Sequence, residues 1–347
     1  MWKFRELFFL SCLIAALLVP LLRMVAFQLG ILDHPKGYGI HAHPVPRLGG
    51  VALYVAFVVG TLYRMDLSEM LKGVLVGSTI IFTIGLLDDL IHLRAGVKLV
   101  GQTLACALMM FKYGVILDVF PNTAVNAFFT ALGILGLTNA VNFLDNMDGL
   151  AAGLVMISSL AIFAVAFSTQ QFWLGYLSMA LAGATAGFLL FNLRKAHVFM
   201  GDSGSTFLGF TLASLAIMCK WSYYLPVTLA VPILILGVPI TDMILNSVLR
   251  AKEGRVKNLK EWLDYAGKDH ISHRLMRLGF GERGAVFFLW GLQAVYAALA
   301  LWILPRKSPY GIAGIAFFLL VTAGFTFFFR KKRQLVLHFS QRPPRRR

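Results

Sequence analysis

The chain contains eleven apolar segments that each approach the length of helix needed to cross a lipid bilayer. A hydrocarbon core about 30 Å thick needs about 20 apolar residues of helix. Hydrophobic residues make up 58% of the 347 residues and charged residues only 14%, which is too few to cover the surface of a soluble protein. The sequence therefore predicts an all-α, polytopic integral membrane protein with about eleven transmembrane helices. The segments are Leu7–Leu29, Leu48–Tyr63, Gly73–Leu87, Val97–Phe111, Ala124–Val141, Leu150–Phe167, Phe172–Phe191, Ser203–Met218, Tyr224–Leu249, Ala285–Leu304 and Gly311–Phe329.

These segments follow one another closely up to residue 330. A long basic loop lies between two of them at residues 250–283, and a basic tail follows at residues 331–347. The chain is therefore predicted to form one transmembrane domain over residues 1–330, to which the long loop belongs, followed by a separate tail.

The excess of positive charge predicts which way the chain crosses the membrane. The formal net charge is +16, from 32 Lys and Arg residues against 16 Asp and Glu residues. Lys and Arg accumulate in short cytoplasmic loops, and an external N-terminus with a cytoplasmic C-terminus places 23 of the 32 on the cytoplasmic side. A nucleic-acid-binding protein is also basic, but it does not need apolar segments throughout. We therefore expect anionic lipids, and no nucleic acid, as partners of the basic loop and tail.

With this orientation, most acidic and histidine residues fall at the cytoplasmic ends of the helices. Transporters place their charged substrate groups near the middle of the bilayer and often contain internal repeats. The one-sided distribution instead favours an enzyme at the cytoplasmic face of the plasma membrane, with a secondary transporter as the alternative of another class. The polar stretches are Gly30–Arg47, Asp88–Asp89, Asn142–Asp148, Asn192–Asp202 and His270–His273.

Two acidic motifs have the composition of a metal or phosphate site. Adjacent residues on a helix point about 100° apart, so one of Asp88 and Asp89 is expected to face the bundle and the other solvent or a partner. A solvated helix end is the simpler interpretation of this pair. Asn142, Asp145 and Asp148 are spaced by three, which places them on one face if the segment is helical. Two carboxylates and an amide on one face can hold a hydrated divalent cation or bind a sugar and a ribose.

The stretch from residue 192 to residue 205 combines phosphate-binding, stacking and metal-binding side chains. Arg194 and Lys195 supply positive charge for a phosphate, and Phe199 is a candidate for stacking on a nucleobase. Asp202 is interpreted as a cap of the following helix, as a metal ligand at a diphosphate, or as both, because a helix N-terminus also attracts phosphate. Mg²⁺ suits such a site because it prefers one or two carboxylates together with phosphate oxygens and water.

A histidine motif and an acid inside an apolar segment complete the candidates. His270, His273 and Arg274 lie within four residues of one another and fit pyrophosphate binding better than Mg²⁺ chelation, because Mg²⁺ prefers oxygen ligands. A basic loop beside anionic lipid is the simpler interpretation of this region. Asp242 lies about 12 Å inside the helix end at Arg250, since each helical residue rises about 1.5 Å. An acid at this depth needs a partner or a function.

In this order, the motifs resemble those of the polyprenyl-phosphate N-acetylhexosamine-1-phosphate transferase superfamily. The resemblance covers most of the chain. The sequence Met-Gly-Asp-Ser-Gly-Ser at residues 200–205 is more similar to the GlcNAc-1-phosphate branch than to the phospho-MurNAc-pentapeptide branch, which is kept as the alternative. The matching residues are His41, Pro44–Gly50, Gly85–Asp89, Asn139–Leu150, Asn192, Val198–Ser205, Pro239 with Asp242, and Asp269–Leu275.

The resemblance implies a membrane enzyme whose catalytic domain is residues 1–330 and which transfers HexNAc-1-phosphate, in the first place GlcNAc-1-phosphate, from a UDP-sugar to undecaprenyl phosphate. The products are a polyprenyl-diphosphate sugar and UMP, at the first membrane step of cell-envelope glycan synthesis. It implies Mg²⁺ as the cofactor, with Mn²⁺ as a substitute. We also consider a homodimer.

The same resemblance implies a role for each motif. Asp202 binds the metal ion, with Asp88 and Asp148 as additional candidate ligands. The implied catalytic residues are Asp88, Asp89, Asp145 and Asp148, the candidate substrate-binding residues are His41, Arg47, Asn142, Asn192, Arg194, Lys195, Phe199, His270, His273 and Arg274, and Asp242 has no assigned role. Two positions depart from the family pattern: Gly39 stands where members commonly have Lys or Arg, and Ser272 stands where they have a histidine.

Overall fold

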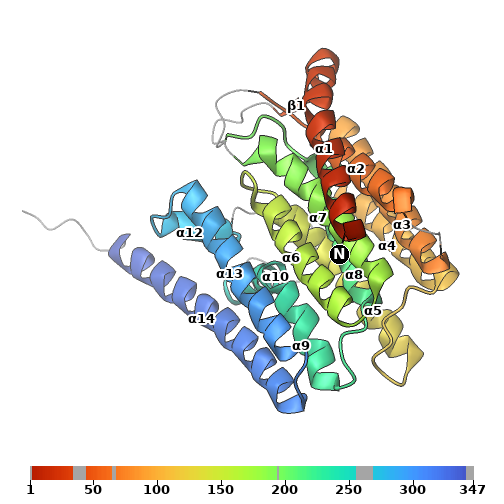
Figure 1. Cartoon of the computed structure of the whole chain (residues 1–347). Helices are drawn as coiled ribbons and strands as arrows, with labels where there is room; N and C mark the ends of the chain where they lie inside the picture. The colour runs from red at the N-terminus through yellow and green to blue at the C-terminus, as the bar shows by residue number, and fades with distance from the viewer. Residues whose placement is uncertain (1, 34–43, 65–67, 194, 255–268, 341–347) are drawn as a thin grey trace, which may run out of the picture.

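The computed structural model describes residues 2–33, 44–64, 68–193, 195–254 and 269–340, and most of these residues are helical (Figure 1). The prediction of an all-α fold is confirmed. Two short strands, β1 (Leu32–Asp33) and β2 (Val45–Pro46), pair antiparallel between the first two helices. The described helices are α1 (Trp2–Leu29), α2 (Gly49–Arg64), α3 (Glu69–Ile91), α4 (Ala95–Tyr113), α5 (Thr123–Leu144), α6 (Leu150–Ser168), α7 (Phe172–Asn192), α8 (Gly201–Met218), α9 (Leu225–Ile235), α10 (Gly237–Lys252), α12 (Ile271–Arg277), α13 (Glu282–Ile303) and α14 (Ser308–Ser340).

Each of the eleven apolar segments expected from the sequence corresponds to a helix or to a pair of helices. Among the described residues, seven helices are long and apolar enough to cross a membrane: α1, α3, α5, α6, α7, α13 and the part of α14 up to Lys331. The pair α9 and α10 adds an eighth if it is one bent span, and α2 is apolar but short. The chain is therefore a multi-pass membrane protein, and the count of eleven spans and the orientation of the termini stay predictions.

Helix α8 packs against α3 and α5 and is the most enclosed part of the bundle. All its side chains over Ser203–Ala216 are buried. Helix α1 packs along α7 and turns large apolar side chains outward, as expected for a surface covered by lipid. Gly183 and Gly187 of α7 permit this close approach, because a Cβ at either position would meet the α1 backbone at Phe8 or Cys12.

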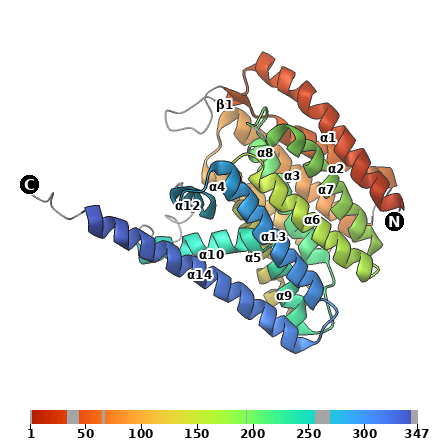
Figure 2. The same ribbon diagram turned by 60° about the vertical axis from the view of Figure 1, so that its left-hand side comes forward.

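Helices α9 and α10 belong to one apolar segment that bends by 84° at Leu236. Figure 2 shows α10 running across the bundle beside the more upright α9. A bend inside apolar surroundings frees backbone groups, each of which is costly to leave without a partner. The buried amide of Gln293 in α13 accepts from Val238 N (3.0 Å) and donates to Ile235 O (2.6 Å). Ser158 of α6 donates to the same Ile235 oxygen (2.7 Å), so the bend is held by side chains from two neighbouring helices.

The helices alternate in direction, and this brings the polar motifs to one end of the bundle. Helices α3, α5 and α7 end there, and α2, α4, α6 and α8 begin there (Figure 1). Hydrogen bonds join these ends directly, for example from the start of α8 to Asp89 of α3 and to Asn142 of α5. Residues that are far apart in the sequence therefore meet in one polar region.

Candidate active site

The N-terminus of α8 is held by a carboxylate from α3. Asp89 accepts hydrogen bonds from the backbone N–H groups of Asp202 (2.8 Å) and Ser203 (3.0 Å). Gly201, with φ of +68°, leaves room for this carboxylate, which a Cβ at that position would strike. The interpretation of Asp202 as the cap of this helix is therefore wrong, because α8 already begins at Gly201 and Asp89 supplies the capping oxygens.

A lysine connects the neighbouring carboxylate of α3 to Asp202. Lys98 Nζ donates to Asp88 Oδ2 (3.0 Å) and to Asp202 Oδ2 (2.7 Å), and the backbone N–H of Leu93 donates to Asp88 Oδ1 (2.6 Å). The two adjacent aspartates thus face different protein partners, and neither forms a simple solvated helix end. Sequence reasoning missed Lys98 as a site residue. The available signal was a lysine at the start of an apolar segment, one helical turn after Arg94.

Helix α5 ends before the second acidic motif is complete. Its last residue is Leu144, and Asp145 has left the helical conformation with φ −78° and ψ 49°. The chain then turns through Gly149, with φ of +75°, before α6 begins. The expectation that Asn142, Asp145 and Asp148 share one helical face is therefore wrong.

The outer two members of this motif contact neighbouring segments. Asn142 Oδ1 accepts from Ser205 Oγ in the first turn of α8 (2.7 Å). Asp148 Oδ2 accepts from the backbone N–H of Ala196 in the loop after α7 (2.7 Å). These contacts bring the end of α5, the start of α6 and the segment before α8 together.

Asp145 shows that the cluster carries an excess of negative charge. Burial, and then the nearby carboxylates of Asp202, Asp89 and Asp148, raises the pKa of Asp145 to about 8. Arg47 opposes this rise without cancelling it. The folded protein therefore favours the neutral form of the Asp145 side chain.

Asn192, at the end of α7, is a buried connector between two loops. Its Oδ1 accepts from Gly149 N (2.8 Å), and its Nδ2 donates to Val198 O (2.9 Å). The expected role was binding of nucleotide and sugar. Because both ends of the amide are bonded to backbone, the structure gives Asn192 a role in positioning the segment before α8.

The Pro-Val-Pro-Arg-Leu-Gly-Gly motif pairs through its backbone with this same segment. Phe199 N donates to Pro46 O (2.8 Å), and Phe199 O accepts from Gly49 N (3.0 Å). Arg47, between these two partners, donates to Asp33 Oδ1 (2.7 Å). The structure therefore brings Arg47 and Phe199 together at the polar end of the bundle, although the sequence separates them widely.

Three further substrate-binding candidates lie near this region or outside the described residues. Lys195 is exposed and has a positive φ of 51°. His41 and Arg194 lie outside the described residues, as does Gly39. Their expected roles stay predictions.

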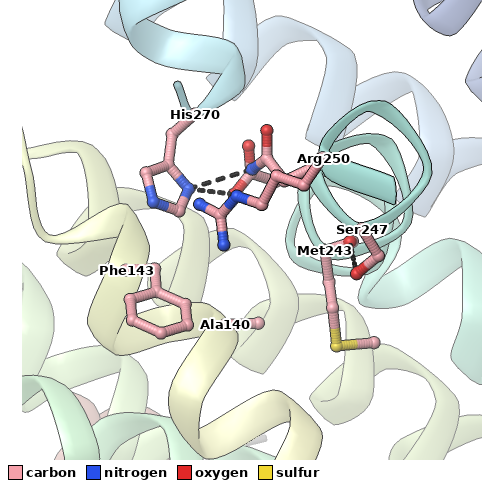
Figure 3. Close-up of a pocket in the computed structure, with 8 residues that line it drawn as sticks. Ala140, Phe143, Met243, Ser247, Arg250 and His270 are labelled. Atoms are coloured by element: carbon pink, nitrogen blue, oxygen red, sulfur yellow. Dashed lines mark hydrogen bonds and ion pairs between the residues drawn. The ribbon is translucent and has the colours of Figure 1, made fainter. Parts of the chain in front are cut away.

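A second polar group surrounds the start of α12, beside a small pocket (Figure 3). Asp242, which is 2% exposed, has Oδ2 at 2.7 Å from His270 Nδ1. Its Oδ1 accepts from Ile271 N (2.7 Å). The acid that the sequence placed inside an apolar segment therefore has a histidine partner. The pocket is lined by Ala140, Phe143, Asp242, Met243, Asn246, Ser247, Arg250 and His270.

The residue before His270 is fixed by a buried ion pair. Arg250 Nε and Nη2 donate to Asp269 Oδ2 (3.0 Å) and Oδ1 (2.7 Å). Although burial raises the pKa of Asp269, the hydrogen bonds and charge of Arg250 outweigh it and hold that pKa below its usual value. Arg274 Nε donates to Asp269 O, and its guanidinium lies 5.8 Å from the ring centre of Phe329. Arg274, expected to hold a diphosphate, is thus buried against protein groups.

Comparison with known proteins shows where this chain belongs. Residues 71–220 match the sequence profile of glycosyl transferase family 4. A Bacillus subtilis protein named as a probable undecaprenyl-phosphate N-acetylglucosaminyl 1-phosphate transferase is 33% identical over 304 residues, which cover 85% of this chain and 83% of that protein. The chain belongs to glycosyl transferase family 4. The resemblance inferred from the motifs is confirmed.

Two further relatives show the range of named activities around this family 4 member. The decaprenyl-phosphate N-acetylglucosaminephosphotransferase of Mycobacterium tuberculosis is 30% identical, over 82% of this chain and 80% of the relative. A phospho-N-acetylmuramoyl-pentapeptide-transferase of Heliobacterium modesticaldum is 33% identical, over 86% of this chain and 96% of the relative. All three names describe transferases, which supports a transferase activity for the family 4 chain described here.

The departure at Ser272 has a structural consequence in this family 4 member. Ser272 is buried, and its Oγ donates to Asn146 Oδ1 (2.8 Å) in the turn after α5. The rings of Phe143 and His270 lie 5.5 Å apart in the same region. The start of α12 and the end of α5 are therefore side by side, and the histidine group adjoins the acidic motif of α5.

The acid cluster has the donor set of a metal site that is completed by substrate. Among the described residues, no group of three or more His, Cys, Asp and Glu could hold a metal ion alone. Mg²⁺ typically uses one or two protein carboxylates with substrate phosphates and water. Asp88 and Asp202, on either side of Lys98, offer such a pair. These residues fit the family's expected metal, and dependence on that metal stays a prediction.

Proposed function

We propose that this protein transfers GlcNAc-1-phosphate from UDP-GlcNAc to undecaprenyl phosphate and releases UMP. The observation that carries the proposal is the cluster of Asp88, Lys98 and Asp202, at one end of a membrane bundle, in a chain 33% identical to a relative named for this reaction. A site at the end of membrane-spanning helices can receive a water-soluble nucleotide sugar and a membrane-bound phosphate together. The product would begin a glycan on its lipid carrier, such as lipopolysaccharide or teichoic acid.

The bond changes in this reaction define what the protein must supply. An oxygen of the lipid phosphate attacks the phosphorus that carries the sugar. The bond from that phosphorus to the bridging oxygen breaks, and UMP leaves with the bridging oxygen. Because the attacking phosphate is already anionic at neutral pH, the protein mainly has to position two anions and offset their charge.

Different residues of the site would bind the metal ion, contact a phosphate and position the metal ligand. Mg²⁺, or Mn²⁺ in its place, would be held by Asp202 with Asp88 or Asp148 and would offset phosphate charge. Lys98 is placed to contact a phosphate oxygen once a divalent cation occupies the carboxylates. Asp89 fixes the first turn of α8 and so sets the position of Asp202.

We further propose that the polar end of the bundle faces the cytoplasm. Eleven passes would place the two termini on opposite sides, and the basic tail favours a cytoplasmic C-terminus. With this orientation, 23 of the 32 Lys and Arg residues lie on the cytoplasmic side. The basic loop and tail would attract anionic lipids at this face. We also propose that the protein forms a homodimer in the membrane.

Release of UMP by the purified protein tests the proposed reaction. The assay contains UDP-GlcNAc, undecaprenyl phosphate and Mg²⁺, and the Asp202→Asn variant is the matched control that should keep the fold and lose turnover. Absence of UMP with every UDP-HexNAc tried, from folded protein, would overturn the enzyme function. Uptake of substrate into vesicles without product would instead support the transporter alternative.

UDP-MurNAc-pentapeptide is a second donor substrate to test, because of the Heliobacterium relative. That phospho-N-acetylmuramoyl-pentapeptide-transferase matches this chain over 96% of its own length. UDP-GlcNAc and UDP-MurNAc-pentapeptide should therefore be offered together. We expect lipid-linked GlcNAc as the main product, and a preference for the pentapeptide donor would assign the chain to the other branch.

A further inference from the structure

We propose that Asp242 is a positioning residue that fixes the ring of His270 with Nδ1 protonated and Nε2 turned away from α10, available to an anionic substrate. The proposal rests on the proposed function only for the identity of the substrate that contacts Nε2. Everything else follows from contacts around the ring. Asp242 has no role in the motif-based expectations, and its depth in an apolar segment makes a buried charge there costly unless it is well bonded.

Both oxygens of Asp242 are committed to the segment that carries His270. Oδ2 lies 2.7 Å from His270 Nδ1, and Oδ1 accepts from Ile271 N at 2.7 Å. One carboxylate therefore holds both the backbone at the start of α12 and the imidazole that precedes it. The Phe143 ring of α5, 5.5 Å away and tilted by 31°, closes one side of the imidazole. The ring is thus held by bonding on one edge and by packing on a face.

The neighbouring amide decides which nitrogen carries the proton. Asn246 Nδ2 lies 3.1 Å from His270 Nδ1, while Asn246 Oδ1 is buried without any hydrogen-bond partner. Rotating the amide by a half turn exchanges these atoms, which the two ends of an amide permit. Asn246 Oδ1 then faces Nδ1, its orphaned state is relieved, and Nδ1–H has two acceptors. The hydrogen bond that Asp242 Oδ1 accepts from Ile271 N agrees with Asp242 acting as an acceptor on both oxygens.

This arrangement sets what His270 offers to a ligand. The two ring nitrogens point in nearly opposite directions, so bonding of Nδ1 to α10 turns Nε2 away from it, as Figure 3 shows. The charged groups around the ring are Asp242 and Arg250 from α10, Asp269 before α12, and Arg274 from α12, whereas the contacting residue of α5 is Phe143.

The Asp242→Asn variant separates positioning from scaffolding. Its Oδ1 can still accept from Ile271 N, so the backbone anchor is retained. Its amide N–H₂ replaces the oxygen opposite His270 Nδ1 and favours the tautomer protonated at Nε2. We expect kcat to fall about 10- to 100-fold, which is the range for residues that orient a metal-ligating histidine, with KM for UDP-GlcNAc nearly unchanged. The pH limb that disappears in His270→Asn should be displaced in Asp242→Asn, because the ring then carries its proton on the other nitrogen.

Two comparisons exclude a merely structural effect. In a double-mutant cycle, Asp242→Asn should cost little further activity once His270 is Asn, because both changes act through one ring. Asp269→Asn is the matched control, since it breaks the buried pair with Arg250 without changing an atom that contacts the ring. It should lower thermal stability and leave Nδ1 of His270 protonated. Because Asp269 also contributes charge near the ring, this control is compared by the tautomer and not by the pH limb. Full additivity in the cycle, or an unmoved pH limb in Asp242→Asn, would overturn the proposal.

A substrate-free measurement keeps this proposal distinguishable from the proposed function. Protein labelled with ¹⁵N at its eight histidines is examined by NMR in detergent, and the His270 signal is identified by its absence in His270→Asn. We expect Nδ1 of His270 to be protonated throughout the pH range in which the protein is folded. A neutral ring protonated only at Nε2 would overturn the proposal, whether or not UMP is released and whether or not Asp242→Asn folds.

Discussion

Lys98 of α4 lies with its Nζ 2.7 Å from Oδ2 of Asp202 at the start of α8. The same nitrogen donates to Asp88 of α3 at 3.0 Å, so one ammonium group joins three helices. It offsets charge in a cluster where burial, and then the carboxylates of Asp202, Asp89 and Asp148, raises the pKa of Asp145. This contact is the centre of the candidate site, and changes around it give measurable consequences.

Replacing Lys98 by Met should destabilise the protein and make its stability depend on divalent cations. Hydrogen bonds to charged groups contribute about 1.5–3 kcal/mol, so we expect a loss of that order in the free energy of unfolding without metal. Mg²⁺ should restore more stability to Lys98→Met than to the parent. In that variant the carboxylates of Asp88 and Asp202 repel each other without the lysine between them, and the cation offsets this repulsion. The measurement is the unfolding temperature in detergent with and without Mg²⁺.

The matched control for this change is Lys72→Met. Lys72 bonds Glu69 at 2.6 Å, but this pair is exposed, and exposed ion pairs contribute little to stability. It should change neither stability nor its Mg²⁺ dependence appreciably. An equal effect of the two substitutions would show that the position of Lys98 is unimportant.

Gly201→Ala should lower stability by more than Gly114→Ala. Both glycines have positive φ, +68° and +69°, and both variants therefore introduce backbone strain of about 1 kcal/mol or more. Only at Gly201 would the new Cβ also strike the carboxylate of Asp89, whereas nothing lies within 4 Å at Gly114. Unfolding temperatures and UMP release should both separate the two variants, and equal values would contradict the close contact of Asp89 with α8.

The chain's apolar pattern predicted the positions of the helices well, because burial in lipid or protein requires long apolar runs in either case. It did not predict the bend at Leu236, since the segment is apolar on both sides and the bend depends on Gln293 from another helix. Spacing by three suggested that helix α5 continues to Asp148. The turn at Gly149 overrides that periodicity.

The sequence predicted which motifs come together at one end of the bundle. It did not predict the contacts that Asp89 and Lys98 make there. The alternation of helix direction places Asp88, Asn142 and Asp202 at one end, and this follows from counting segments. The cap that Asp89 provides to α8 and the bridge that Lys98 makes are long-range contacts. No local spacing encodes them, because they depend on how α3, α4 and α8 pack.

The pH dependence of stability should report Asp145 directly. Its ordinary pKa is about 4, and the folded protein raises it to about 8. The folded state therefore favours neutral Asp145, and this contribution to stability is complete below about pH 4 and is lost as the pH rises through about 8. Without divalent cations, Asp145→Asn should become more stable than the parent as the pH is raised from 5 to 8.5, measured as the difference in unfolding temperature.

Two controls accompany this pH experiment. Asp118→Asn, an exposed acid between α4 and α5 at the other end of the bundle, should follow the parent at every pH. Added Mg²⁺ should narrow the gap between Asp145→Asn and the parent at pH 8.5, because a cation stabilises the ionised cluster. A gap that is the same at pH 5 and pH 8.5 would contradict the raised pKa.

Gln293→Leu should destabilise the bend between α9 and α10. It leaves Val238 N without its acceptor and removes one of the two donors to Ile235 O. Leaving a buried polar group unpaired costs about 1–3 kcal/mol, and the unfolding temperature should fall accordingly. Ser158→Ala is the milder control, because Ile235 O then keeps Gln293 as a donor. A larger loss in Ser158→Ala than in Gln293→Leu would contradict this description of the bend.

The fate of the β-phosphate of UDP-GlcNAc tests the proposed chemistry most directly. With ³²P at the phosphorus that carries the sugar, purified protein and undecaprenyl phosphate should produce a labelled lipid that contains both the sugar and the label, together with unlabelled UMP. The Asp202→Asn variant should leave the label in the water-soluble donor. Label recovered in UDP beside a glycosylated lipid would mean that the sugar moves without its phosphate, and would contradict the transfer of GlcNAc-1-phosphate.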